Sequence, residues 1–157
     1  MALVVDIVTK VLAVEYLAGQ PPGKLVGGAP DLTLARNTGA AFSLGTGMTI
    51  VFTLLALVVV VVIVRTARKL YSRGWALSLG LVLGGAMGNL VDRIFRHPAP
   101  LRGAVIDFIS LFDPWGQVWP IFNIADSAIV VGGVLVVVLA FSGVEMNGTR
   151  TRGTSKK

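Results

Sequence analysis

The chain has 157 residues, of which 54% are apolar and 14% are charged. Soluble domains contain about 25% charged residues, so this chain lacks the polar side chains needed to cover a water-facing surface. Intrinsic disorder is excluded because it needs low hydrophobicity and high charge. The absence of cysteine and the single histidine, His97, exclude disulfide scaffolds, cysteine-based metal sites and multi-histidine metal sites. The composition therefore predicts an integral membrane protein.

The net charge of +6 reflects basic residues that gather beside apolar runs. Four lie in one short stretch and four in the tail: Arg65, Arg68, Lys69 and Arg73, then Arg150, Arg152, Lys156 and Lys157. Basic residues beside membrane segments are retained on the cytoplasmic side. The clusters therefore indicate orientation and give no reason to expect a nucleic-acid partner.

Transmembrane helices are expected in chain order at about residues 1–17, 48–64, 75–92 and 121–144. A helix needs about 20 apolar residues to cross the hydrocarbon core. With the basic loop 65–74 on the cytoplasmic side, residues 48–64 run inward, 75–92 outward and 121–144 inward. Residues 1–146 then form a single transmembrane domain, and 147–157 form a basic, disordered cytoplasmic tail.

The first segment is irregular because it carries Asp6 and Lys10 and covers only about 25 Å at 1.5 Å per residue. It has no basic start, and Asp6 interrupts the apolar core that a cleavable signal peptide needs. We expect the outer two-thirds of a first transmembrane helix; a start codon placed too late or a trimmed chain would each explain its shortness. Asp6 and Lys10 are spaced for a helical ion pair, which either neutralises itself or positions a substrate or another acid.

Two segments are expected outside the membrane, on the outer face. Residues 32–36 alternate in a way that favours a short strand, and so do residues 104–109. Trp115 and Trp119 precede the last span, as expected of an interfacial aromatic belt.

Polar residues near the outer ends of two spans are candidates for function, because ionisable groups inside a bilayer are costly. Asn89, Asp92 and Arg93 fall on one helical face. The preceding glycines recur every four residues and predict close helix packing: Gly80, Gly84 and Gly88.

Asp126 lies about 8 Å below the outer boundary of the last span, on one face with Asn123 and Ser127. No basic residue lies within that span, so Asp126 must pair with another element, sit in a wet cavity or be protonated. Asp107, in the apolar stretch 105–109, is the natural partner. Two carboxylates in low dielectric cannot both ionise, so one of them keeps a proton. The ionised carboxylate can then act as a base that activates water, and the protonated one as an acid that protonates the leaving group. Their pKa values then belong to the pair.

The run Asn37-Thr-Gly-Ala-Ala-Phe-Ser43 reads alone as a turn. Together, these motifs would converge at one membrane level just inside the outer leaflet.

The motifs resemble those of the prolipoprotein signal peptidases (signal peptidase II), a family of bacterial inner-membrane aspartic endopeptidases. The matching pieces occur in the family's order: Asp6-x-x-x-Lys10, Asn37-Thr-Gly-Ala-Ala-Phe-Ser43, Gly84-Gly-Ala-x-Gly88-Asn89-x-x-Asp92-Arg93, Val105-Ile-Asp107-Phe108 and Phe122-Asn123-x-Ala-Asp126-Ser127.

The resemblance implies that Asp107 and Asp126 are the catalytic pair. It also implies that a further group binds the substrate or supports the pair, namely Asn37, Asn89, Arg93 and Asn123, and less directly Asp6 and Lys10. Asp92, Gly84 and Gly88 would be structural. The substrate would be a diacylglyceryl-modified prolipoprotein, cleaved on the amino side of its lipidated cysteine, without a metal or other cofactor.

The fold implied is an all-α membrane protein, a bundle of four transmembrane helices with a small extracytoplasmic β-cradle and a short interfacial helix. The cradle and the mobile helix would lie around residues 32–36 and 93–116. The resemblance further implies a protein of the bacterial inner membrane in contact with lipid, with both termini cytoplasmic, the site near the outer leaflet and inhibition by globomycin-type peptides. A site built within one chain suggests a monomer.

Two alternatives differ in chemistry. A serine/lysine peptidase would use Ser43 and a neutral Lys10, but Asp6 one turn away favours the charged lysine. A small proton-linked transporter or channel subunit would use its buried acids as a proton relay, although the chain lacks a broken-helix repeat.

Overall fold

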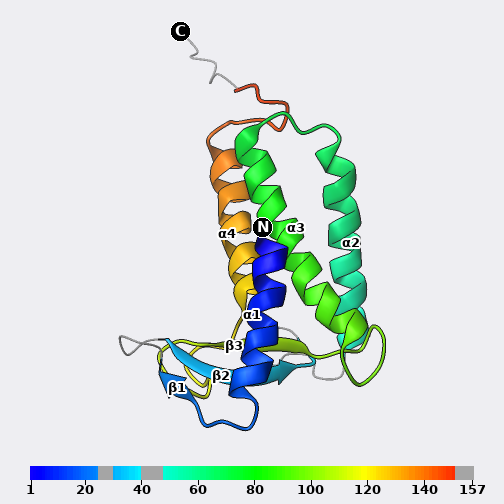
Figure 1. The fold of residues 1–157 in the computed structure, drawn as a ribbon. Helices are drawn as coiled ribbons and strands as arrows, with labels where there is room; N and C mark the ends of the chain where they lie inside the picture. Colours follow the sequence, from blue (N-terminus) through cyan, green and yellow to red (C-terminus); the bar gives the residue numbers. More distant parts are fainter. Residues whose placement is uncertain (25–29, 40–47, 151–157) are drawn as a thin grey trace.

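The structure is a computed structural model that describes residues 1–24, 30–39 and 48–150. Within these ranges the chain forms four helices joined by a small sheet (Figure 1). The helices are α1 (Ala2–Leu17), α2 (Thr49–Ala67), α3 (Arg73–Phe95) and α4 (Ile124–Phe141). The strands are β1 (Gly23–Lys24), β2 (Asp31–Asn37) and β3 (Val105–Ser110).

Three helices, α2, α3 and α4, are long and apolar enough to cross a membrane. They lie side by side, and α1 lies against the half of this bundle that is nearer the sheet (Figure 1). With 16 residues, α1 is not among the spanning candidates. Three of the four expected spans are therefore present at full length, and the first is shorter.

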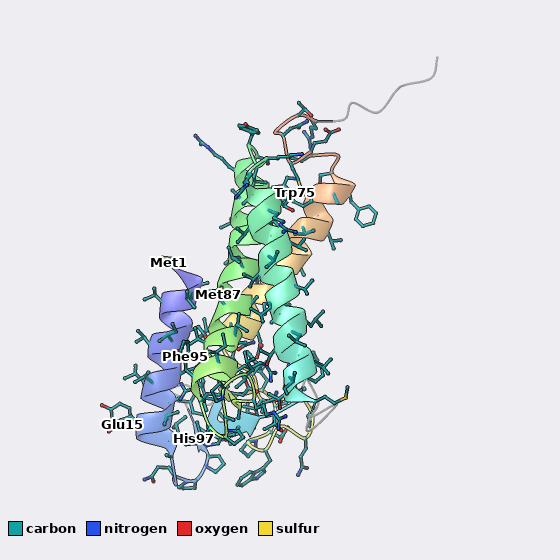
Figure 2. All side chains as sticks on the ribbon, turned by 90° about the vertical axis from the view of Figure 1, so that its right-hand side faces the viewer. Met1, Glu15, Trp75, Met87, Phe95 and His97 are labelled. Carbon is teal, nitrogen blue, oxygen red and sulfur yellow. The ribbon has the colours of Figure 1, made fainter. Side chains whose placement is uncertain are left out.

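The start of α1 lies beside the middle of α3. Ala2 packs against Gly84, and Figure 2 shows Met1 near the level of Met87 and well away from Trp75. Helix α1 therefore runs beside the part of α3 that is nearer the sheet.

The last helix begins three residues later than expected because Asn123 caps it. The Asn123 side chain accepts a hydrogen bond from the Asp126 backbone N–H (2.9 Å), and the Asp126 carboxylate accepts one from the Asn123 N–H (3.2 Å). This reciprocal arrangement satisfies two N–H groups that a helix start leaves unpaired. At the other end, Gly143 adopts a positive φ of 67°, which commonly terminates a helix.

The basic loop and the end of the described chain meet at one end of the bundle, as the charge pattern predicted. The backbone N–H groups of Tyr71 and Ser72 donate to the carbonyl of Met146, and Trp75 Nε1 donates to that of Val144 (2.7 Å). Residues 147–150, which we expected to be disordered, form a turn in which Thr149 donates to Asn147. The rest of the predicted tail lies outside the described residues.

The sheet lies at the opposite end of the bundle (Figure 1). Its order is β1-β2-β3 and both pairings are antiparallel. The two strands predicted at 32–36 and 104–109 are confirmed as β2 and β3. One face packs under α1, through a core of Ala13, Ile106 and Phe108.

The short helix expected within residues 93–116 is not found, and the described chain there consists of the end of α3, turns and β3. Pro98 and Pro100 explain this, because proline lacks the N–H that a helix needs and restricts the residue before it.

Glycines in α3 allow two other helices to approach. A Cβ on Gly84 would lie 3.0 Å from Ala2 of α1, and one on Gly88 would lie 2.4 Å from the Asp6 carboxylate, so both positions match their predicted packing role. A Cβ on Gly80 would meet nothing within 4 Å. The tightest helix contact belongs instead to Gly85, whose Cβ would lie 2.3 Å from the carbonyl oxygen of Ala125 in α4.

Gly85→Ala is expected to destabilise the protein by about 1–3 kcal/mol, because the added methyl group forces α3 and α4 apart. Thermal unfolding in detergent measures the loss. Gly80→Ala is the matched control and should unfold at or above the wild-type temperature, since alanine favours a helix and nothing obstructs its methyl group. Equal unfolding temperatures for Gly85→Ala and the wild type would contradict this packing.

Candidate active site

Two aspartates from separate elements face one cavity at the sheet end of the bundle. Asp107 lies in the middle of β3 with 2% of its surface exposed, and Asp126 lies in the first turn of α4. Both line a cavity of about 720 Å³. The Asn123 side chain links them, since it donates to Asp107 Oδ1 (2.6 Å) and accepts from the Asp126 backbone N–H. The structure therefore brings together the two aspartates that the sequence singled out.

Asn37 and Asn123 both direct their amide groups at Asp107. The Asn37 carbonyl oxygen accepts from the Gly39 N–H (2.9 Å), which leaves its NH2 group to donate to Asp107 Oδ2 (3.1 Å). The Asn123 oxygen is likewise held by the start of α4, so its NH2 group faces Asp107 Oδ1. In each amide the oxygen accepts from a backbone N–H, which can only donate. The NH2 group must therefore face the Asp107 carboxylate.

Asn89 does the same for Asp126. Its Nδ2 donates to Asp126 Oδ1 (2.8 Å), while its Oδ1 accepts from Lys10 Nζ (2.9 Å) and Asn123 Nδ2 (3.2 Å). Because the lysine ammonium offers only donors, it requires the amide oxygen of Asn89 on its side. Lys10 therefore determines which group Asn89 presents to Asp126.

Lys10 is buried, with 1% of its surface exposed, among two carboxylates. Its ammonium lies 2.8 Å from Asp6 Oδ2, as the spacing of the two residues predicted, and 2.9 Å from Asp92 Oδ2, which the sequence did not indicate. Asp92 also binds Arg96 and accepts from the Ile106 N–H (3.2 Å). Asp92 is thus a structural junction of α1, α3 and β3, in line with its expected role.

Asp6 connects the same cluster to α4. Its Oδ1 accepts a hydrogen bond from the Ala125 backbone N–H (2.8 Å), one of the free N–H groups in the first turn of that helix. Gly88 makes room for this contact, because a Cβ there would collide with the Asp6 carboxylate.

Arg93 points toward β2 and not toward Asp92, its neighbour on the same helical face. Its Nη2 donates to the Gly39 carbonyl (2.8 Å), and its guanidinium lies 5.8 Å from the centre of the Phe52 ring. The buried Nη1 has no hydrogen-bond partner within the described chain. Arg93 also lines the same cavity as the aspartates.

The other residues that line the large cavity are mostly apolar, and many of them come from the membrane helices. They include Leu55 and Val59 of α2, Val82 and Ala86 of α3 and Val130 of α4. Phe52 and Trp119 also line it, and their positions in the sequence gave no sign of a site beyond the predicted aromatic belt. Residues 40–43 of the predicted Asn37–Ser43 motif lie outside the described residues.

Burial raises the pKa of Asp107 to about 7, from an ordinary value of 3.8. The negative charge of Asp126 raises it further, whereas the amides of Asn37 and Asn123 act in the opposite direction. The Asp107 carboxyl group is therefore partly protonated near neutral pH.

Paired carboxylates beside an apolar cavity, at the end of a bundle with spanning helices, define a membrane-embedded protein equipped for acid–base chemistry. Residues 1–142 match the sequence profile of the family described as signal peptidase (SPase) II. The chain belongs to this signal peptidase II family. The predicted family and the predicted enzyme class, an aspartic peptidase, are confirmed.

Relatives support this assignment over nearly the whole chain. The lipoprotein signal peptidase of Mycobacterium leprae is 52% identical over 147 residues, which are 94% of this chain and 71% of that protein. The lipoprotein signal peptidase of Rhodococcus jostii is 51% identical over 156 residues, 99% of this chain and 76% of that protein.

Two solved structures, both of bacterial membrane enzymes, share the fold. One superposes with a TM-score of 0.77 at 24% identity, covering 99% of this chain and 90% of its own. The other has a TM-score of 0.72 at 27% identity, covering 88% and 86%.

These findings decide between the alternatives. Because the chain belongs to a peptidase family, its main function is not that of a proton-linked transporter or channel subunit. A serine/lysine mechanism is disfavoured because Lys10 Nζ is already engaged by Asp6 and Asp92, at 2.8 Å and 2.9 Å, and by Asn89. Its proposed partner, Ser43, lies outside the described residues.

The raised pKa of Asp107 predicts a pH-dependent stability. Between about pH 4 and pH 7 the folded protein keeps a proton that the unfolded chain has released, so this stabilisation is complete below pH 4 and is lost as the pH rises to about 7. The slope is at most about 1.4 kcal/mol per pH unit. Unfolding temperatures measured from pH 4.5 to 8 should fall for the wild type and fall less for Asp107→Asn.

Asp113→Asn is the control for this prediction. Backbone N–H groups of Val118 and Gln117 lower the pKa of Asp113, so its titration lies below the pH range of the experiment. The variant should keep the wild-type slope. An Asp107→Asn protein with the full slope would show that Asp107 does not titrate in this range.

Proposed function

We propose that Asp107 and Asp126 are the catalytic residues with which this signal peptidase removes the signal peptide from diacylglyceryl-modified bacterial prolipoproteins. Cleavage falls on the amino side of the lipidated cysteine. The observation that carries the proposal is the placement of both carboxylates, linked through Asn123, at the end of an apolar cavity.

The two carboxylates have different roles. Asp126 takes a proton from water, whose oxygen attacks the carbonyl carbon of the residue before the cysteine. Asp107, whose raised pKa leaves it partly protonated near neutral pH, donates its proton to the nitrogen of the cysteine as the peptide bond breaks. Asp126 then holds the proton taken from water, so the two carboxylates again share one proton between them. Hydrolysis of the bond therefore needs only the pair and one water molecule.

Arg93 and the three amides support this chemistry. Nη1 of Arg93, which has no hydrogen-bond partner among the described residues, binds a substrate carbonyl in the cavity, while Nη2 holds the backbone at Gly39. Asn37 and Asn123 fix the rotamer of Asp107, and Asn89 fixes that of Asp126. Lys10 and Asp6 act one step further away, through Asn89 and through the start of α4.

The apolar cavity suits a lipidated substrate. Its walls between α2, α3 and α4 accept acyl chains and the end of the signal peptide, and globomycin-type peptides compete for the same space. The basic end of the bundle faces the cytoplasm, so the sheet and the aspartates lie at the outer leaflet of the inner membrane. In this arrangement α1 is the fourth membrane helix, and one chain contains the whole site.

Asp107→Asn and Asp126→Asn should each lower the rate of signal-peptide release by about 10²–10⁴-fold, the usual contribution of a general acid or base. A gel-shift assay with a diacylated prolipoprotein measures the release. Asp31→Asn, on β2 and outside the cavity, is the control and should cleave at the wild-type rate. Full cleavage by either variant of the pair, in protein that folds and inserts, would end the proposal.

Lys10 is proposed to act through Asn89, which predicts losses that do not add. Asn89→Leu should lower kcat about 10- to 100-fold, since a hydrogen bond to a charged group contributes about 1.5–3 kcal/mol. Lys10→Met should lower kcat by a similar factor, and Lys10→Arg by less because it keeps the charge. All values refer to the folded fraction.

The double variant Lys10→Met/Asn89→Leu tests the connection. If the lysine acts through the amide, its kcat should lie close to that of Asn89→Leu alone. Losses that multiply would show that Lys10 acts independently of Asn89, through the fold of α1.

A further inference from the structure

A second cavity, of about 360 Å³, adjoins the aspartates on the side of the sheet. We call it the sheet-side cavity. It shares part of its wall with the large cavity, namely Asn37, Gly39, Asp107, Pro120 and Ile121. Asp107 therefore lies where the two cavities meet.

The two cavities differ in the elements that form them. The large cavity extends along α2, α3 and α4, the helices that are long enough to span a membrane. The sheet-side cavity has no wall from these helices; it is formed by the end of β2, by Asp107 of β3 and by the loop that leads to α4. One cavity is thus suited to groups that reside in the membrane, and the other to a polar chain outside it.

When a peptide bond is held at Asp107, the parts of the substrate chain before and after that bond extend away from Asp107 in different directions. The signal peptide and the acyl chains belong to the membrane and fit the large cavity. The chain that follows the cysteine leaves the membrane and needs a path along polar backbone.

We propose that the sheet-side cavity binds the first residues of the mature polypeptide after the lipidated cysteine, and that it limits the size of the residue directly after that cysteine. This inference rests on the proposed function and adds a specificity site to it.

Ala35 and Trp115 are two of the side chains that form the wall of the sheet-side cavity. Ala35 pairs with Asp107 across β2 and β3, so both side chains project from the same face of the sheet. Trp115 forms another part of the wall and is 64% exposed, which leaves its ring free to contact a bound peptide. The small residue at 35 provides room that a larger one would fill.

The loop that carries Trp115 is held in a fixed shape by Asp113. The Asp113 carboxylate accepts hydrogen bonds from the N–H groups of Trp115 (2.9 Å), Gln117 (3.0 Å) and Val118 (2.8 Å). Gly116 completes the turn with a φ of 71°, where a Cβ would also lie 2.8 Å from Ile121. Trp115 is therefore part of a built wall and not of a loose surface loop.

The test compares two diacylated prolipoproteins that differ only in the residue after the cysteine, glycine in one and phenylalanine in the other. The measured quantity is the ratio of kcat/KM for glycine over phenylalanine. Ala35→Leu narrows the cavity and should raise this ratio at least about fivefold. Trp115→Ala widens it and should lower the ratio at least about threefold.

Trp119→Ala is the matched control, because Trp119 is an exposed tryptophan of the same loop that lines only the large cavity. It should leave the ratio within about twofold of the wild type. The ratio is insensitive to the amount of folded enzyme, so a merely destabilised variant would not change it.

Opposite shifts for the two variants support the subsite. A shift below twofold in either, shifts in the same direction, or an equal shift in Trp119→Ala would overturn it. Asp107→Asn, assayed on both substrates, separates this outcome from failure of the proposed function: if it still abolishes cleavage, only the subsite is wrong.

Discussion

The site depends on the interactions of the buried Lys10 ammonium. A buried charge is stable only when its partners compensate for the loss of water, and here two carboxylates and an amide oxygen surround it. Lys10 and Asp6 come from α1, whereas Asp92 and Asn89 come from α3. The contacts that dock α1 on α3 are therefore the same contacts that orient the Asn89 amide. In this way the position of a short helix at the edge of the bundle determines that Asn89 presents its NH2 group to Asp126.

The two aspartates are held by different means, so identical side chains have different surroundings. Asp107 projects from the interior of a strand, where both oxygens accept from asparagine amides and burial keeps its pKa near 7. Asp126 belongs to the capping turn of α4, and its carboxylate also closes the start of that helix. A residue that caps the start of a helix is fixed by the backbone itself, so its position needs little help from packing. The pair is asymmetric because one member belongs to the sheet and the other to a helix start.

The sequence predicted the features that depend on neighbouring residues. Helix spacing revealed the Asp6–Lys10 pair, and alternation revealed the strands that carry Asn37 and Asp107. Contacts between elements that are distant in the chain could not be predicted from a local sequence pattern. Asp92 joining Lys10, Arg93 turning to the Gly39 carbonyl, and Gly85 meeting α4 depend on the level at which helices pack, which no local pattern encodes. The meeting of Asp107 and Asp126 at one cavity was predicted because an unpaired acid within a span requires a partner, and because the family resemblance pairs these two residues.

The location of the aspartates at the junction of helices and sheet follows from the chemistry of the backbone. Within the hydrocarbon core every N–H and C=O group must be paired, and a helical signal peptide meets this condition by itself. Hydrolysis requires the opposite, since the bond to be cleaved must leave the helix and expose its carbonyl to water and to a catalytic pair. Such a bond needs new polar partners at the point where the membrane helices end. The end of β2, the guanidinium of Arg93 and the capping turn of α4 provide polar groups at that level, next to the apolar cavity. A peptidase for a membrane-inserted substrate is therefore expected to join a small sheet to its helices, as this chain does.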